Sequence, residues 1–243
     1  MDKIIIDGDM VAYRAAFASE YETKWDEDQW TLLCSETDMK REVETFFSNL
    51  RTRLDSDNLT PVFSPSTNYR YDIFPEYKAS RKTKRKPLGL KWLFGWMKET
   101  YGGITAENME ADDWIGILCT KDPKKTIAVS GDKDFATLPI RWYNPLKDEL
   151  KEVTEEEARN FHLIQTLAGD QADGYSGAKG VGLIGAKKLM DKKGYTWDTV
   201  VGAFEKAGQT EEDALVNARL AYILQHKDYD NDTKKINLWN PSK

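Results

Sequence analysis

The chain has 243 residues, of which 40% are hydrophobic and 31% charged, with a formal net charge of −6 at pH 7. This mixture excludes a disordered chain and allows one large α/β domain, or a core with a smaller module. Two cysteines without metal-ligand spacing and only two histidines exclude a disulfide-rich protein, a histidine-rich zinc site and a catalytic triad. No apolar run approaches the length of a membrane span, so we expect a soluble, cytoplasmic monomer.

Strands and helices are expected to alternate in the first 153 residues. Strands are predicted at 3–7, 60–63, 126–130 and 140–144, and helices at 11–19, 38–54, 90–101 and 111–119. This order predicts an α/β fold with a central, mainly parallel sheet flanked by helices. After a capping box at 154–157 the chain is predicted to be helical and to pack on the sheet, with helices at 154–168, 184–192, 197–206 and 211–225.

Acidic residues are grouped where predicted strands end or helices begin. They are Asp7 with Asp9, Glu110 with Asp112 and Asp113, Asp132 with Asp134, and Asp170 with Asp173. Crowded carboxylates repel one another, so the groups indicate a hard divalent cation such as Mg²⁺. In an extended chain Asp7 and Asp9 would share one face, and on an ideal helix Glu110 and Asp113 would share a face that Asp112 does not. The structural alternatives are helix capping by Asp9 and charge–dipole compensation around Glu110.

A basic segment and a glycine-rich segment complete the unusual features. Residues 77–91 contain seven basic residues and no acidic one: Lys78, Arg81, Lys82, Lys84, Arg85, Lys86 and Lys91. Aromatic neighbours such as Tyr77 and Trp92 favour nucleic acid over a merely solvated loop. The glycine-rich segment, which suits a phosphate at a helix N-terminus, carries Gly180, Gly182 and Gly185 and then Lys187 and Lys188.

Five segments, in order, resemble the 5′→3′ exonuclease and flap endonuclease family in its bacteriophage form, above all the compact exonucleases of short-tailed phages. The segments are 6–9, 75–82, 110–113, 130–135 and 169–189. The resemblance implies a PIN-like fold with a nuclease core at 1–153 and a basic helical arch at about 76–101. It further implies a helical DNA-binding region at 154–243, with a helix–three-turn–helix module at about 165–191 that often binds K⁺.

The resemblance also implies a role for each matched residue. One metal ion would be held by Asp7, Glu110, Asp112 and Asp113, and a second by Asp132, Asp134, Asp170 and Asp173. Lys78 and Arg81 would contact the scissile phosphate, and the rest of the arch and the glycine loop would bind DNA through Tyr77, Lys82, Lys84, Arg85, Lys86, Gly180, Gly182, Gly185, Lys187 and Lys188. The family usually has an Asp after its second strand, where this chain has Pro65, and Asp9 could compensate.

The predicted function is therefore hydrolysis of DNA from 5′ ends, with removal of 5′ flaps or of RNA primers in RNA–DNA hybrids. Two Mg²⁺ ions, for which Mn²⁺ could substitute, would assist catalysis, and the protein would act in the cytoplasm of an infected bacterial host. Two alternatives stay open. The run Asp7-Gly8-Asp9 also fits a haloacid dehalogenase-type phosphatase with Asp7 as nucleophile, and Pro65 fits a non-catalytic DNA-binding homologue.

Overall fold

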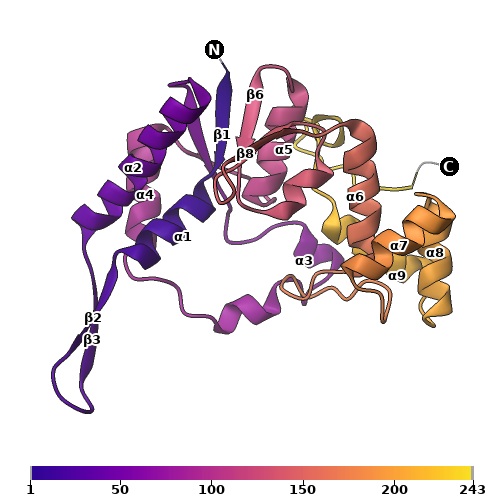
Figure 1. Ribbon diagram of the computed structural model, residues 1–243, viewed down its shortest axis with the longest axis horizontal. Coiled ribbons are helices and arrows are strands. Elements are labelled where there is room, and N and C mark those ends of the chain that lie inside the picture. The colour runs from indigo at the N-terminus through magenta and orange to yellow at the C-terminus, as the bar shows by residue number, and fades with distance from the viewer. Residues whose placement is uncertain (1, 242–243) are drawn as a thin grey trace.

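The computed structural model describes residues 2–241 and is built around one mixed sheet (Figure 1). Within these residues the strand order is β5-β4-β1-β6-β7-β8. Neighbouring strands are parallel except for β8, which runs antiparallel to β7. The mainly parallel sheet is thus confirmed, and its strands are β1 (Lys3–Asp7), β4 (Leu59–Phe63), β5 (Ile104–Thr105), β6 (Thr126–Val129), β7 (Arg141–Asn144) and β8 (Glu149–Glu152).

Helices cover both faces of the sheet, because the central strand β1 is apolar on both sides. Ile4 and Ile6 point into one core, while Ile5 between them points into the other. The first core lies beneath α1 (Gly8–Ala18), α2 (Glu36–Leu54) and α4 (Leu90–Tyr101), and the second beneath α5 (Ala111–Lys121). The continuous apolar run at 4–6 is therefore what places β1 at the centre.

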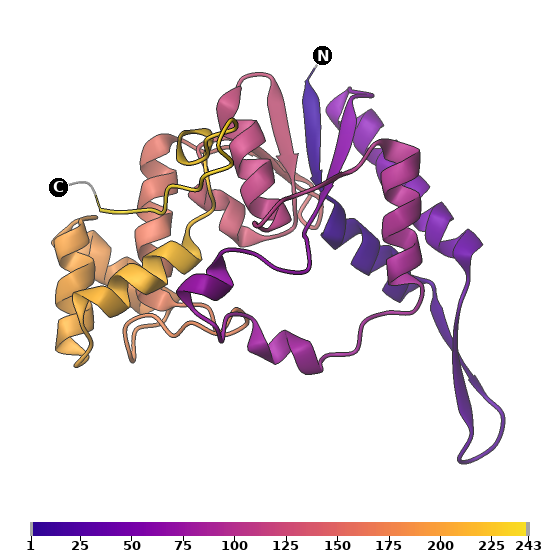
Figure 2. The same ribbon diagram turned by 180° about the vertical axis from the view of Figure 1, so that it is seen from behind.

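The last third of the chain is helical, as predicted, and packs against the sheet domain (Figure 2). It contains α6 (Glu155–Ala168), α7 (Leu183–Lys193), α8 (Trp197–Lys206) and α9 (Glu211–Ala221) around a separate apolar cluster. The 3₁₀ helix η2 (Lys133–Thr137) packs on α6, and η3 (His226–Asp228) packs on α5. Across residues 2–241, every helix is too short or too polar to cross a membrane.

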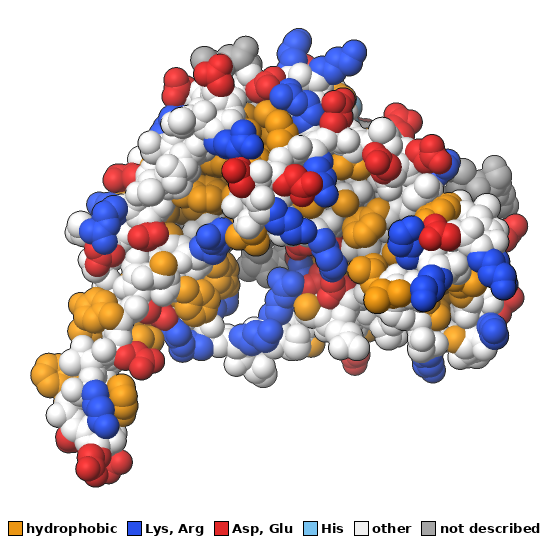
Figure 3. All heavy atoms as spheres, viewed as in Figure 1, with side chains coloured by type: hydrophobic (Ala, Val, Ile, Leu, Met, Phe, Trp, Pro, Cys, Tyr) orange, Lys and Arg blue, Asp and Glu red, His pale blue; other side chains and the backbone are white. Residues whose placement is uncertain are grey.

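The basic segment bridges the two halves of the molecule as an arch, defined here as residues 74–89 (Figure 1). It runs from α3 (Arg70–Ile73) to α4 and is helical only in the short 3₁₀ helix η1 (Ala79–Thr83). The prediction of an arch extending to residue 101 was wrong, because Leu93 and Met97 of α4 are fully buried in the core. Figure 3 shows Lys and Arg side chains along this bridge.

A β-hairpin that the sequence did not predict projects from the end of α1 (Figure 1). Its strands are β2 (Glu20–Lys24) and β3 (Trp30–Cys34). Trp25 and Trp30 at its tip are 65% and 55% exposed. At its base Glu20 accepts hydrogen bonds of 2.6 and 2.8 Å from Arg85 and one of 2.7 Å from the Leu88 N–H. The hairpin therefore holds one end of the arch.

Candidate active site

The first pair of carboxylates lies at the carboxyl end of β1. Asp7 caps α1 by accepting a 2.9 Å hydrogen bond from the Met10 N–H, and its second oxygen accepts one of 3.0 Å from Ser130 Oγ. Because the helix begins at Gly8, Asp9 is in its first turn instead of an extended strand. Asp9 accepts a 3.0 Å hydrogen bond from the Ser64 N–H, next to Pro65. Asp7, not Asp9, is thus the cap, and Asp9 reaches the loop where the family has its further acid.

The acids at the start of α5, Glu110, Asp112 and Asp113, are arranged differently from the ideal-helix expectation. Asp113 is fully buried and receives hydrogen bonds of 2.5 and 2.9 Å from Arg70 and one of 3.1 Å from the Leu224 N–H. It also accepts a 3.1 Å hydrogen bond from the Glu110 N–H, which closes a capping box. That box turns Asp113 inward, so the structure does not bring it to the site as a metal ligand. Asp112, expected to point elsewhere, is the residue that feels the charges of Asp7 and Asp132.

The remaining carboxylates line a cleft of about 400 Å³. Asp132 follows β6, caps η2, and accepts a 2.9 Å hydrogen bond from the Asp134 N–H. Lys133 Nζ lies 2.9 Å from Asp170 Oδ2 and 3.3 Å from Asp134 Oδ1. The structure thus brings four predicted acids together around this cleft: Asp132, Asp134, Asp170 and Asp173.

The arch closes over these carboxylates through its first residues. Lys78 Nζ lies 2.6 Å from Glu110 Oε1 and 3.7 Å from Asp173 Oδ2, and an Arg81 nitrogen lies 2.5 Å from Asp173 Oδ1. The Tyr77 hydroxyl is within hydrogen-bonding distance of both acids, at 2.9 and 3.1 Å. Tyr77 is only 2% exposed, so the structure contradicts its prediction as a residue that stacks on DNA bases. Its hydroxyl instead bridges Glu110 and Asp173.

The outer part of the arch is exposed, in keeping with the predicted contacts to DNA. Lys82, Lys84 and Lys86 are exposed, whereas Arg85 is tied to Glu20 of the hairpin. Lys78 has a left-handed backbone (φ +53°), and its N–H donates a 2.8 Å hydrogen bond to the Asp173 carbonyl. This backbone bond fixes the start of the arch against the loop that carries Asp170 and Asp173.

Burial and mutual repulsion leave several of these acids reluctant to ionise. Burial, with the charges of Asp9 and Asp132, raises the pKa of Asp7 to about 7. Burial and the charges of Asp7 and Asp132 also raise the pKa of Asp112 well above its usual value. Burial and Asp132 raise the pKa of Asp134 to about 6. The protein therefore holds more negative charge here than its own cations neutralise.

By contrast, two carboxylates that contact basic side chains, those of Glu110 and Asp170, have lowered pKa values. Burial alone would raise the pKa of Glu110, but the charges of Lys78 and Arg70 lower it overall. Burial likewise opposes ionisation of Asp170, yet the hydrogen bond and charge of Lys133 lower its pKa.

The donor set fits a hard divalent cation. Every side chain concerned offers carboxylate oxygen, which Mg²⁺ and Mn²⁺ prefer, and the raised pKa values of Asp7 and Asp112 show uncompensated charge that such an ion would neutralise. In the described part of the chain no three acidic, His or Cys side chains are already gathered as a ready-made metal-binding group. Lys78, Arg81 and Lys133 contact carboxylates that such a group would use.

The glycine-rich segment connects α6 to α7, as the helix–three-turn–helix prediction requires. Gly180 has a φ of +80°, and a side chain there would point into open space. Gly182 caps α7 without a side-chain hydrogen bond, so this helix presents free N–H groups in its first turn. Lys187 pairs with Asp191 at 3.0 Å, and both lysines are exposed. This surface is available to a phosphate backbone.

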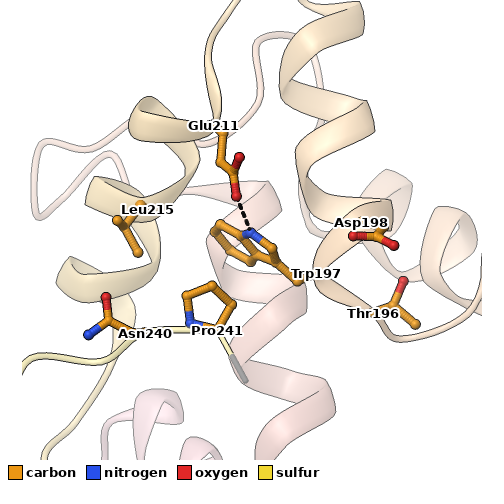
Figure 4. A pocket seen from close by; sticks show the side chains of 7 residues that line it. All are labelled: Thr196, Trp197, Asp198, Glu211, Leu215, Asn240 and Pro241. Carbon is orange, nitrogen blue, oxygen red and sulfur yellow. Dashed lines mark hydrogen bonds between the residues drawn. The ribbon is translucent and has the colours of Figure 1, made fainter. Parts of the chain in front are cut away.

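A second, larger hollow of about 740 Å³ lies away from the carboxylates, among α8, α9 and the C-terminal tail (Figure 4). Trp197 forms its floor and donates a 2.8 Å hydrogen bond to Glu211, with Leu215 and Pro241 beside it. The hollow is open and its two acids do not converge on a common point. It offers no chemistry comparable to that of the acidic cleft.

Sequence reasoning missed the residues that hold the acids in place. Arg70 binds Asp113, Ser130 binds Asp7, and Gln165 of α6 donates a short hydrogen bond to Asp134. Gln165 and Arg70 carried no local signal, since each reaches its partner through the tertiary fold. Lys133 stood within the motif at 130–135, but only its acidic neighbours were assigned a role.

Several known proteins are similar in sequence to this chain. The family model described as the 5′–3′ exonuclease, N-terminal resolvase-like domain, matches residues 2–161. The chain belongs to the 5′–3′ exonuclease family. It is 29% identical to the exodeoxyribonuclease of Enterobacteria phage T3, over 98% of this chain and 92% of the relative. The exonuclease of Escherichia phage T7 is also 29% identical, over 98% and 93%.

Solved structures of this family share the fold. A zinc-bound T5 5′-exonuclease superposes with a TM-score of 0.70 at 16% identity, covering 91% of this chain and 89% of that one. A T5 flap endonuclease in complex with DNA and metal ions superposes with a TM-score of 0.68, again at 16% identity and with the same coverage. The fold expected from the resemblance, a PIN-like sheet with a helical C-terminal region, is confirmed.

Proposed function

We propose that the protein is a metal-dependent 5′→3′ exonuclease and 5′-flap endonuclease of DNA. The observation that carries this proposal is the acidic cleft, where carboxylates that follow β6 and α6 meet beneath a basic arch. Asp7 at the end of β1 is near enough to Asp132 for the two charges to interact. The phage exonucleases and the flap endonuclease described above support the reaction and the substrate. Mg²⁺ is the proposed ion, with Mn²⁺ as a substitute.

Two groups of residues would hold the ions. The first would comprise Asp7, Glu110 and Asp112, with Asp9 in place of the acid missing at Pro65; the second would comprise Asp132, Asp134, Asp170 and Asp173. When bound, divalent ions supply Lewis-acid stabilisation of the attacking and leaving oxygens of a phosphodiester. Asp113 is left out of the first group, because Arg70 and two backbone N–H groups already occupy its oxygens.

The arch would recognise the phosphate that is cut. Lys78 and Arg81 lie directly on the acids, so a phosphate entering the cleft would exchange carboxylate partners for phosphate oxygens on the same cations. Their positive charge would then stabilise the negative charge that grows on the phosphate. Lys82, Lys84 and Lys86 would bind the strand that leads to it, and Gly180, Gly182, Gly185, Lys187 and Lys188 would hold the duplex, with K⁺ at this loop.

The proposed substrates are DNA with 5′ ends or 5′ flaps, and RNA–DNA hybrids with a 5′ RNA segment. The proposed working form is a monomer in the cytoplasm of a phage-infected bacterium, in line with the phage source of the relatives. The competing haloacid dehalogenase-type phosphatase has no support from the family match. In addition, both oxygens of Asp7, its nucleophile, accept hydrogen bonds within the fold.

A cleavage assay tests the proposal. Wild-type protein with a 5′-labelled duplex and a 5′-flap duplex should release short 5′ products in Mg²⁺ and none in EDTA. Asp132→Asn should lose at least about 100-fold in rate, the size of a missing metal-site contribution. Asp57→Asn, a change of an exposed acid outside the cleft, should leave the rate unchanged. DNA binding without cleavage in any divalent metal would instead identify the protein as the non-catalytic homologue.

A further inference from the structure

Lys133 lies between two carboxylates of the second acidic group, which consists of Asp132, Asp134, Asp170 and Asp173. Its Nζ is 2.9 Å from Asp170 Oδ2 and 3.3 Å from Asp134 Oδ1. Asp134 belongs to η2, whereas Asp170 belongs to the loop after α6, so a single ammonium group joins the sheet domain to the helical region. In this position it neutralises carboxylates that would otherwise repel each other across the cleft.

In the first acidic group Lys78 pairs with Glu110 at 2.6 Å, but within residues 2–241 no cation joins two of the group's members. Asp7 accepts hydrogen bonds only from the Met10 N–H and from Ser130 Oγ, and within residues 2–241 neither Asp7 nor Asp112 has an ion-pair partner. A cation arriving from solution therefore meets two carboxylates without an ion pair, those of Asp7 and Asp112, in the first group. In the second group it meets a pair that already shares a lysine.

We propose that Lys133 is an internal counter-ion that a divalent cation must displace, so that the second ion binds more weakly than the first. This inference rests on the proposed function, because it requires a divalent ion at the second group. Displacement is sterically open, since the Lys133 side chain is 54% exposed on a flexible four-carbon stem. Asp134 keeps its position when the lysine leaves, because Gln165 also binds it.

The consequence is a built-in threshold for the second ion. The first group is filled at low ion concentration, and the second only when the ion can outcompete a tethered ammonium group. Lys133 is a positioning residue in this scheme, because it acts on the carboxylates and does not touch the substrate. Removing its charge should tighten the weaker binding event and leave the tighter one almost unchanged.

Isothermal titration of the full chain with Mg²⁺, without DNA, measures both binding events. Lys133→Met should tighten the weaker event about fivefold, as expected for loss of one half-exposed ion pair. Lys133→Arg, which keeps the charge, should retain wild-type affinities. Lys147→Met controls for the loss of one positive charge, since Lys147 lies exposed in the turn between β7 and β8. Asp170→Asn should remove the weaker event and cancel the effect of Lys133→Met.

A second readout follows the lysine itself. In ¹⁵N-lysine-labelled protein the Lys133 ammonium signal, assigned by its absence from Lys133→Arg, should shift as Mg²⁺ fills the weaker site and not while it fills the tighter one. Equal affinities in wild type and Lys133→Met, or equal tightening by Lys147→Met, would overturn the inference and leave the proposed function intact. No Mg²⁺ binding in any variant would instead overturn the proposed function.

Discussion

Adjacent acids in α5 should respond to the same substitution with opposite signs. Asp113→Asn replaces a carboxylate that binds the Arg70 guanidinium in a fully buried pair, with side-chain exposures of 0% and 3%. Each Asp113 oxygen accepts from one Arg70 nitrogen and one backbone N–H, so the amide N–H₂ that replaces one oxygen faces two donors whichever way it turns. The nearest other carboxylate that Arg70 could bind is that of Glu110, whose Oε2 lies 3.6 Å from Arg70 Nη1. Breaking one partner of a buried pair costs about 3–5 kcal/mol.

Asp112→Asn should have the reverse effect on the metal-free protein. Burial and the charges of Asp7 and Asp132 raise the pKa of Asp112 well above its usual value, so its ionised form is disfavoured in the fold. Replacing it with a neutral amide of the same shape removes that repulsion and should stabilise the metal-free chain. The same change should abolish part of the stabilisation by Mg²⁺, whereas Asp113→Asn should retain it.

Urea unfolding followed by tryptophan fluorescence, with EDTA or with Mg²⁺, measures both effects. With an m-value of about 3 kcal/mol/M, Asp113→Asn should lower the midpoint by about 1 to 1.7 M in EDTA. Asp112→Asn should raise it. Equal and small shifts for both variants in EDTA, with equal loss of Mg²⁺ stabilisation, would show that Asp113 is a metal ligand after all and would refute the assignment to Arg70.

Three further predictions follow from the site and its surroundings. Because the pKa of Asp7 is about 7, protons compete with Mg²⁺, and titration calorimetry should show affinity falling about tenfold from pH 8 to pH 6 in wild type but not in Asp7→Asn. Burial lowers the pKa of His162 to about 4, so as pH falls the unfolded chain binds this proton first, and stability is lost between about pH 6.5 and pH 4. In urea titrations, wild type should therefore lose about 2 kcal/mol more unfolding free energy than His162→Gln between pH 7 and pH 5. Equal losses would contradict this. Replacing Lys187 and Lys188 with Ala should weaken duplex binding and reduce the slope of log affinity against log salt by about 1 to 2, measured by fluorescence anisotropy, and an unchanged slope would place the duplex elsewhere.

The centre of the sheet could be predicted because its strands there are apolar on both faces. The apolar runs at Ile4–Ile6 and Thr126–Val129 predict buried strands, and the structure has a buried strand at each. The acids that follow these two strands lie at the same edge of the sheet. The β2–β3 hairpin could not be predicted. Its strands are exposed on both faces, so no apolar core imposes an alternation on the sequence.

The acids of α5 show why the site was only partly predictable. Spacing on an ideal helix correctly separates Asp112 from Asp113 but does not say which face meets the cleft. That choice depends on the capping box and on Arg70, 43 residues away in sequence. Pairing of Lys133 with Asp170 likewise depends on how α6 packs against η2, which no local pattern encodes.

The bond between Asp113 and the Leu224 N–H has a consequence for how the protein is made. Arg70, which holds Asp113, also donates hydrogen bonds to the carbonyls of Leu220 and Tyr222, at 3.3 and 2.7 Å. The start of α5 is therefore completed by a residue that the ribosome adds 111 positions after Asp113. A nascent chain that already carries every acid of the cleft still lacks the segment that fixes Glu110 and Asp112. Nuclease activity should thus appear only after Leu224 has emerged.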